Sequence, residues 1–244
     1  TGQSLLDDGL KLKLPKSDPI KPVDKAIFYH ASQSVPHTSS GYAIRTHGLV
    51  SSLKKKGYDV NVFLRTGYPL DRSDFKGDEV NALEQIGNVD YHFSITNPND
   101  PELINYQDVY NYNKLKEYEE KSIASIISSA EKVKPMVIHS ASNFVVGLAG
   151  AKAAKLLGIP SIYEVRGLWH LTQSTKREGY DSSDHYNLSE RLEIETANES
   201  DYVFTITGSL KDLLVEKGVD QEKIFILPNA VDQNKFNLMP KDKQ

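Results

Sequence analysis

The segment at residues 135–165, PMVIHSASNFVVGLAGAKAAKLLGIPSIYEV, decides the fold. It contains a short apolar run, then a helix-length stretch over Phe144–Leu157 that ends at Gly158, then a second apolar run, SIYEV, at 161–165. A glycine directly after a helical stretch is a common stop signal, because glycine adopts the left-handed conformation without a steric penalty. Strand, helix and strand in this order predict two parallel strands joined by a crossover helix.

The same alternation continues on both sides of this segment. Apolar runs predict strands at 25–31, 59–64, 89–95 (after a Gly87-Asn88 hairpin turn), 201–206 and 223–227, and helical spacing predicts helices at 41–56, 114–134, 188–199 and 209–217. The strands are mostly continuous apolar runs, as expected where helices cover both faces of a sheet. The predicted fold class is therefore α/β, a Rossmann-like doubly wound parallel sheet of at least six strands.

Composition narrows the class of protein. The chain has 244 residues, of which 39% are apolar and 25% charged, so it is long enough to bury a sizeable core. The absence of cysteine excludes disulfides, thiol nucleophiles and cysteine metal sites. A net charge of -4 gives no indication of nucleic-acid binding, and no apolar run approaches the ~18 residues of a membrane-spanning helix. No HExxH, GxSxG or GxxxxGK[ST] motif is present, and we expect no metal and no cofactor.

Polar residues follow almost every predicted strand. Because the carboxyl ends of parallel strands meet at one edge of a sheet, these residues are expected to converge on a polar ligand there. The candidate binding residues at this edge are Ser40, Gly41, Tyr42, Arg45, His139, Asn143, Gly167, Trp169 and Asn229. The stretch EVRGLW, at 164–169, leaves two interpretations open. Either Arg166 and Trp169 handle the ligand, or Trp169 fills the core while Arg166 pairs with Glu164.

Dinucleotide binding is the first alternative to consider for a sheet of this kind. The loop after the first predicted strand holds one glycine, Gly41, where a pyrophosphate-binding loop needs several. Arg65 stands at the end of the second strand, where an NAD enzyme carries an acid. NAD(P) binding is therefore disfavoured, although the helix that begins at Gly41 offers its dipole to an anion.

The sequence resembles the N-terminal, acceptor-side domain of a GT-B fold glycosyltransferase of the family-4 retaining type. The resemblance covers residues 25–236 and is carried by SSGYAIRTHGLVSSLKKKGYDVNVF, KPMVIHSAS, AAKLLGIPSIYEVRGLW, ESDYVFTIT and, most specifically, LPNAVD. SSGYAIR departs from the paired-glycine loop that is commoner in the family, and the arginine of YEVRGLW stands where many members have histidine.

The resemblance implies a function for the whole protein. A sugar would pass with retention from a nucleotide-sugar donor to a hydroxyl of a sugar or lipid-linked sugar acceptor, as in bacterial cell-surface glycan synthesis. Arg166 is implied as a catalytic residue that stabilises the leaving diphosphate. A cytoplasmic protein is expected, with peripheral contact to the inner face of a membrane left open, and a mobile flap is expected at 173–186 near the acceptor.

The resemblance also implies a division of the chain. Residues 1–24 are polar and proline-rich and are expected to form an N-terminal arm, 25–232 the glycosyltransferase domain, and 233–244 the start of a linker. The second domain would bind the nucleotide sugar, so we expect the chain to be inactive without it. Two other functions stay open: a sugar-nucleotide epimerase of the same fold, and a non-catalytic module that binds a sugar or a partner.

Overall fold

The computed structural model describes residues 10–105, 109 and 111–231. The strands are β1 (Ala26–Ala31), β2 (Asp59–Leu64), β3 (Leu83–Ile86), β4 (Val89–His92), β5 (Val137–Ala141), β6 (Ser161–Val165), β7 (Tyr202–Thr205) and β8 (Ile224–Ile226). The helices are α2 (Gly41–Lys55), α3 (Tyr112–Val133), α4 (Phe144–Leu157), α5 (Trp169–Ser174), α6 (Asp184–Glu199) and α7 (Gly208–Glu216), with short 3-10 turns at Tyr180–Ser182 and Gln221–Lys223.

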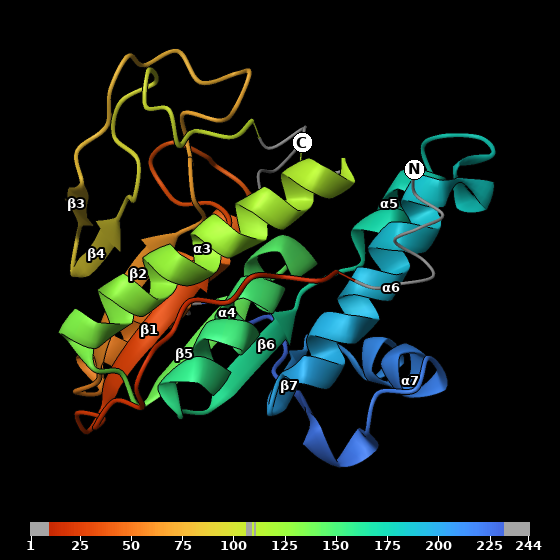
Figure 1. Cartoon of the computed structure of the whole chain (residues 1–244). Helices are drawn as coiled ribbons and strands as arrows, with labels where there is room; N and C mark the ends of the chain where they lie inside the picture. Colours follow the sequence, from red (N-terminus) through yellow and green to blue (C-terminus); the bar gives the residue numbers. More distant parts are fainter. Residues whose placement is uncertain (1–9, 106–108, 110, 232–244) are drawn as a thin grey trace, which may run out of the picture.

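The strands form one sheet in the order β3-β4-β2-β1-β5-β6-β7-β8 (Figure 1). All neighbouring pairs are parallel except β3 and β4, which form the hairpin predicted at Gly87-Asn88. The predicted Rossmann-like α/β class is confirmed. The bounds of β3, the strand before this turn, were not predicted, because LEQI is short, half polar and at the outer edge of the sheet.

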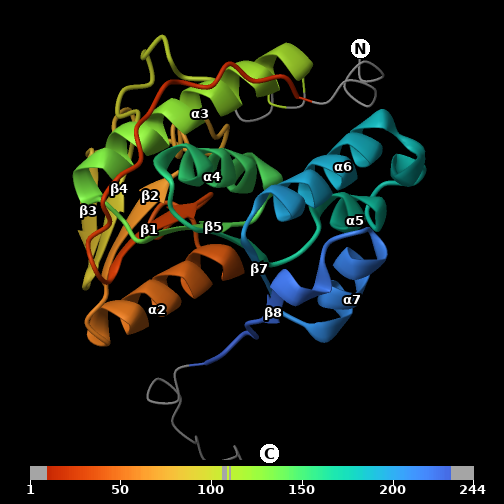
Figure 2. The same ribbon diagram turned by 60° about the horizontal axis from the view of Figure 1, so that its bottom comes forward.

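Helices lie on both faces of the sheet. Figure 2 shows α3, α4 and α6 on one side and α2 on the other. Helix α2 packs Val50 against Val60 and Val62 of β2, whereas α3 and α4 pack against Phe28 and Ile138 on the opposite face. The chain begins β1 only after its described N-terminal residues have passed along α3 and α4 (Figure 1), where Ile20 N donates to Leu157 O at 3.0 Å.

Helix α4 lies unusually close to the sheet. A Cβ at Gly147 would collide with the ring of Tyr163, and one at Gly150 would collide with Ser140 Oγ. The glycines and alanines of FVVGLAGAKAAKLL therefore let the helix backbone approach β5 and β6 closely. This approach holds the N-terminal end of α4, and with it Ser142 and Asn143, at the carboxyl edge of the sheet.

The segment predicted as a flap, 173–186, is partly helical. It contains the end of α5, the turn at Tyr180–Ser182 and the first residues of α6, which begins at Asp184 and not at the predicted Leu188. Ser183 accepts a hydrogen bond from Tyr186 N and so starts the helix one turn early. Apolar spacing did not reveal this turn because its residues are polar. The mobility of the segment stays a prediction.

A buried carboxylate supports the N-terminus of α4. Glu193 of α6 is 2% exposed; its Oε1 accepts from Phe144 N at 3.2 Å, and its Oε2 accepts from the hydroxyl of Tyr163. Burial raises the pKa of Glu193 to about 7, although both hydrogen bonds act in the opposite direction. The folded protein therefore holds this proton at pH values where the unfolded chain has released it.

We predict that this proton makes stability depend on pH. Because the folded pKa lies above the unfolded value, the contribution of Glu193 is complete below about pH 4.5 and is lost as the pH rises to about 7. In Glu193→Gln, the melting temperature should fall less between pH 5 and 7.5 than in the wild type. Asp184→Asn, at the exposed start of the same helix, serves as the control. Identical pH profiles for wild type and Glu193→Gln would contradict the assignment.

Candidate functional site

A cleft of about 300 Å³ opens at the carboxyl ends of β1, β2, β5 and β6. The residues that line it are Ser32, Gln33, Tyr42, Arg65, Asp71, Arg72, Ser73, Asp74, Ser142, Asn143, Gly167 and Trp169. Its volume lies at the lower end of the range for small-molecule sites, about 300–1,000 Å³. Hydroxyls, amides, charged groups and two aromatic side chains therefore face one enclosed space.

Four of the residues predicted from the sequence line this cleft: Tyr42, Asn143, Gly167 and Trp169. Trp169 is 45% exposed, so it does not fill the core. Gly167 permits a close approach, because a Cβ there would lie 3.3 Å from the hydroxyl of Tyr42. Burial raises the pKa of Tyr42, so its phenol stays neutral in the cleft.

Ser40 and Gly41 lie at the start of α2, next to Tyr42, which lines the cleft. Ser40 Oγ accepts from Ala43 N at 3.2 Å and donates to Gln33 Oε1 at 2.8 Å. Ser40 is therefore the N-cap of α2, and it positions Gln33, which lines the cleft. Both residues belong to the frame of the site rather than to its lining.

The carboxylate of Glu164 forms the centre of a buried network behind the cleft. Its side chain is fully buried and accepts from Tyr29 Oη at 2.8 Å, Arg45 Nε at 2.8 Å, His139 Nε2 at 3.1 Å and Arg166 Nη2 at 3.0 Å. Burial opposes its ionisation, but the hydrogen bond from His139 and the charge of Arg166 outweigh that effect and hold the pKa of Glu164 well below its usual range. His139, predicted to bind substrate, lies in this network and does not line the cleft.

Arg166 lies between this network and α2. The pairing with Glu164 that the sequence left open is present, and the guanidinium also donates from Nη1 to Tyr42 O and Thr46 Oγ1, each at 2.9 Å. The residue is 7% exposed and does not line the cleft, although the next residue, Gly167, does. Arg166 therefore fixes the backbone of Tyr42, which does line it.

Arg45 connects the same network to the end of the domain. Its Nη1 donates to Pro228 O and Asn229 Oδ1, each at 3.0 Å, and its Nη2 donates to Leu227 O at 2.9 Å. Together with Nε on Glu164, these bonds employ every nitrogen of the guanidinium. Arg45 and Asn229, both predicted as binding residues, are thus bonded to each other, and Asn229 belongs to the LPNAVD segment, outside the lining of the cleft. Asp232 and the predicted linker at 233–244 lie outside the described residues.

The charged side of the cleft was not predicted from the sequence. Arg65 and Asp71 form a buried ion pair, with exposed fractions of 4% and 5%, and Arg72 pairs with Asp74 at the rim. Burial raises the pKa of Asp71, against the opposing charge of Arg65. From the sequence, Arg65 was considered only in the argument against NAD(P) binding. The loop that carries the other three has no motif, and only folding shows that it turns back over the strand ends.

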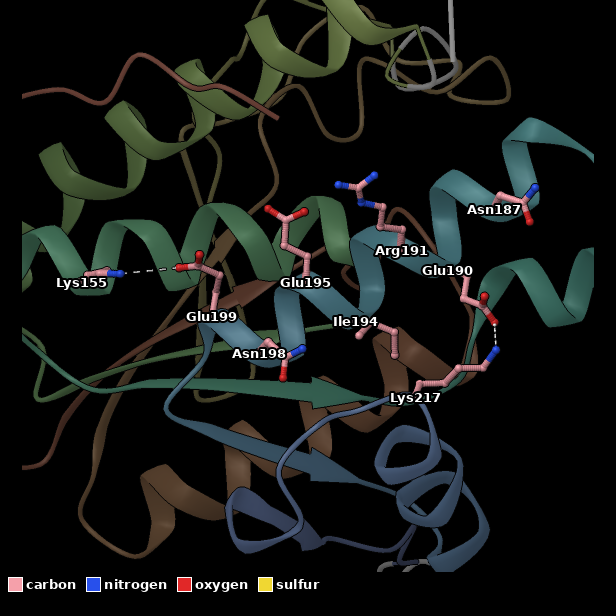
Figure 3. A pocket seen from close by; sticks show the side chains of 9 residues that line it. All are labelled: Lys155, Asn187, Glu190, Arg191, Ile194, Glu195, Asn198, Glu199 and Lys217. Carbon is pink, nitrogen blue, oxygen red and sulfur yellow. Dashed lines mark ion pairs between the residues drawn. The ribbon is translucent and has the colours of Figure 1, made fainter. Parts of the chain in front are cut away.

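A larger open hollow, about 720 Å³, lies along α6 (Figure 3). Its lining is mostly long charged side chains from α4, α6 and the end of α7, and it includes two ion pairs, Lys217–Glu190 at 2.8 Å and Lys155–Glu199 at 3.8 Å. It contains none of the predicted binding residues and lies away from the strand ends. We therefore assign the functional site to the smaller cleft.

Within the described part of the chain, no group of three acidic or histidine side chains is arranged to hold a metal ion. Among the described helices, none is long and apolar enough to cross a membrane.

The parallel sheet, its two helical layers and the polar cleft at the carboxyl edge define a class: the Rossmann-like half of a GT-B fold. The chain belongs to Glycosyltransferase Family 4, whose model matches residues 39–235. No curated protein is significantly similar to it in sequence.

Solved structures agree on the fold. HepE from Anabaena, in complex with UDP-glucose, has a TM-score of 0.52 and 13% identity, over 88% of this chain and 47% of that one. A UDP-N-acetylglucosamine 2-epimerase from Listeria monocytogenes, described as putative, has a TM-score of 0.51 and 16% identity, over 83% and 45%. MnaA from S. aureus, with UDP, has a TM-score of 0.50 and 17% identity, over 85% and 47%. The chain thus spans less than half the length of these proteins.

We predict that Arg45 holds residues 227–229, which follow the last strand, in place. Arg45→Ala removes one partner of buried Glu164 and all three bonds to residues 227–229, so the free energy of unfolding should fall by about 3 kcal/mol. Hydrogen exchange should show faster exchange at the amides of Leu227 and Asn229. Asn229→Ala, which loses a single acceptor, should change either quantity far less. Unchanged exchange at these amides in Arg45→Ala would contradict the proposed role of Arg45 in holding residues 227–229.

Proposed function

We propose that this chain is the acceptor-binding half of a retaining glycosyltransferase that moves a sugar from a nucleotide-sugar donor to a hydroxyl of a sugar or lipid-linked sugar. One observation carries the proposal: a chain of Glycosyltransferase Family 4 has a polar cleft with aromatic side chains at the carboxyl edge of its sheet. Bacterial cell-surface glycan synthesis in the cytoplasm, with peripheral contact to a membrane, is the setting that we propose.

The cleft contains the groups that a saccharide needs. Trp169 and Tyr42 present aromatic surface to a sugar ring, and Asn143 presents an amide to its hydroxyl groups. The hydroxyl of Ser142 donates to Glu164 O and accepts from Arg166 N, so it supports the wall of the cleft. Asp71 adds a buried carboxylate, whose Oδ1 has no hydrogen-bond partner among the described residues. In this proposal the acceptor lies in the cleft, and the donor is held mainly by a second domain beyond the strand ends.

Arg166 has two roles to distinguish. The sequence predicts that it stabilises the diphosphate directly, which requires a guanidinium that reaches the donor. Its bonds to Tyr42 O, Thr46 Oγ1 and Glu164 support a positioning role instead, because they occupy both terminal nitrogens inside the protein. We propose that Arg166 acts through α2, by fixing the wall of the acceptor cleft.

The second candidate function is a sugar-nucleotide epimerase, favoured by the fold that the chain shares with the putative epimerase from Listeria monocytogenes. Product analysis separates the two reactions. A transferase needs an acceptor and releases a nucleoside diphosphate together with a glycosylated product. An epimerase converts one sugar nucleotide into another without any acceptor.

We predict that Trp169 contributes to acceptor binding. In the protein with its second domain, Trp169→Ala should raise the KM for the acceptor about 10- to 100-fold, as expected for the loss of roughly 1.4–3 kcal/mol of contact. The KM for the donor should not change. Leu171→Ala, on the same helix, 37% exposed and outside the cleft lining, is the matched control. Equal kinetics for both variants, in an active transferase, would remove Trp169 from the site.

We predict that Arg166→Lys separates positioning from direct catalysis. Lysine keeps a charge beside Glu164 but loses the forked geometry that reaches Tyr42 and Thr46. The melting temperature should therefore change little, while the KM for the acceptor rises. Steady-state kinetics and thermal melting on the same preparation give both quantities. A fall in kcat of about 10²–10³-fold at constant acceptor KM would instead show the direct role predicted from the sequence.

A further inference from the structure

A separate cavity of about 260 Å³ lies between α3 and the outer strands of the sheet. Residues from β1, β2, β4 and α3 line it: Phe28, His30, Phe63, Leu64, Thr66, Ala82, His92, Phe93, Ser94, Ser122, Ser125, Ile126, Ser129, Lys132 and Val133. It shares no lining residue with the acceptor cleft. The connection from β2 to β3 contains no helix that could cover β4 on this face of the sheet. Strand β4 also lies beyond the edge of α3 (Figure 1).

One wall of the cavity is a stack of rings from three adjacent strands. Phe28 and Phe63 have centroids 3.9 Å apart with planes 4° from parallel, and Phe63 and His92 are 4.5 Å and 15° apart. These separations are close to the spacing of neighbouring strands. The ring planes are therefore roughly perpendicular to the sheet, so the edges of the rings, and not their faces, point from the sheet toward α3.

The opposite wall is a line of hydroxyls. Ser122, Ser125 and Ser129 share one face of α3 because they are three and four positions apart, whereas the neighbouring buried positions hold Ile123, Ile126 and Ile127. Ser122 donates to Thr66 Oγ1 at 3.1 Å. Ser125 and Ser129 have no hydrogen-bond partner in the part of the chain that the structure describes. Ser122 is buried, whereas Ser125 and Ser129 are half-buried at the border of the apolar face, so their hydroxyls line the cavity and are accessible to a ligand.

The cavity is also close to electrically neutral. His30 Nδ1 lies 3.1 Å from Val146 O and must carry the proton, so Nε2 keeps its lone pair as an acceptor. Burial lowers the pKa of His30 to about 4 and also lowers that of His92. Lys132 is the charged residue of the lining, and it is exposed.

We propose that this cavity binds a small, neutral, planar aromatic molecule that carries a hydrogen-bonding group. The positive edges of the ring stack suit the negative face of a π-system in edge-to-face contact. A saccharide is disfavoured, because its C–H groups need aromatic faces and not edges. The volume lies just below the range for drug-sized ligands, about 300–1,000 Å³, which limits the ligand to one or two rings. The hydroxyls of Ser125 and Ser129 bind its polar group.

The test compares an aromatic, planar probe with its saturated, non-planar analogue. 2-Naphthol and decahydro-2-naphthol carry a hydroxyl at the same position of the same two-ring carbon frame, but only 2-naphthol has a π-face and a phenolic hydroxyl. By calorimetry, we expect 2-naphthol to bind saturably and about tenfold more tightly than the saturated probe. Chemical-shift changes should centre on the amides around Ser125. Absence of saturable 2-naphthol binding, equal affinity for both probes, or binding of methyl glucoside in place of 2-naphthol would overturn the proposal.

A pair of variants locates the probe. Ser125→Phe fills the cavity and should weaken 2-naphthol binding at least about tenfold, whereas Ser128→Phe puts the same ring on the exposed side of α3 and should leave binding unchanged. Ser125→Leu serves if the larger side chain prevents folding, and thermal melting checks both. Retained binding in a folded Ser125 variant would also overturn the proposal. The comparison of the two probes stands without any variant, and neither result depends on glycosyl transfer.

Discussion

The buried carboxylate of Glu164 is the constraint on which the rest of the site depends. Moving a charge out of water costs several kcal/mol unless partners surround it. Here donors come from β1, α2, β5 and the residue after β6, so elements far apart in the sequence must meet at one point. Loss of any one donor leaves a buried charge partly unpaired. The network therefore fixes α2 against the sheet more firmly than apolar contacts alone, because hydrogen bonds specify direction as well as distance.

Two arginines connect Glu164 to different parts of the domain. Arg166 connects it to the first turns of α2 and so to Tyr42 in the wall of the cleft. Arg45 connects it to residues 227–229, where the chain leaves the last strand. The orientation of residues 227–229 and the shape of the cleft are thus set by the same carboxylate. In the transferase that we propose, this common support keeps the acceptor and donor sites in a fixed relation.

The cleft and the aromatic cavity arise from opposite features of one sheet. At the carboxyl edge, the close approach of α4, made possible by Gly147 and Gly150, brings Asn143 next to the ends of the strands. On the α3 face, the missing helix between β2 and β3 leaves the ring stack at His92 without a cover of its own. The cleft results from the close packing of α4 on the sheet, and the cavity results from the absence of a helix between β2 and β3. The segments that connect the strands, rather than the strands themselves, therefore determine where both lie.

The sequence by itself determined the fold class. The apolar runs and glycine stops of 135–165 gave β5, α4 and β6 with their observed bounds to within two residues, because period and capping are local properties. It also identified Tyr42, Asn143, Gly167 and Trp169 as residues of the strand ends. Only the tertiary structure decided which polar residues face the cleft and which face one another. Glu164 appeared in the sequence as a partner for Arg166 alone, and nothing local shows that Arg45, 119 positions away, donates to it as well. The Arg65–Asp71 pair was missed for the same reason: long-range contacts between charges leave no period in a sequence.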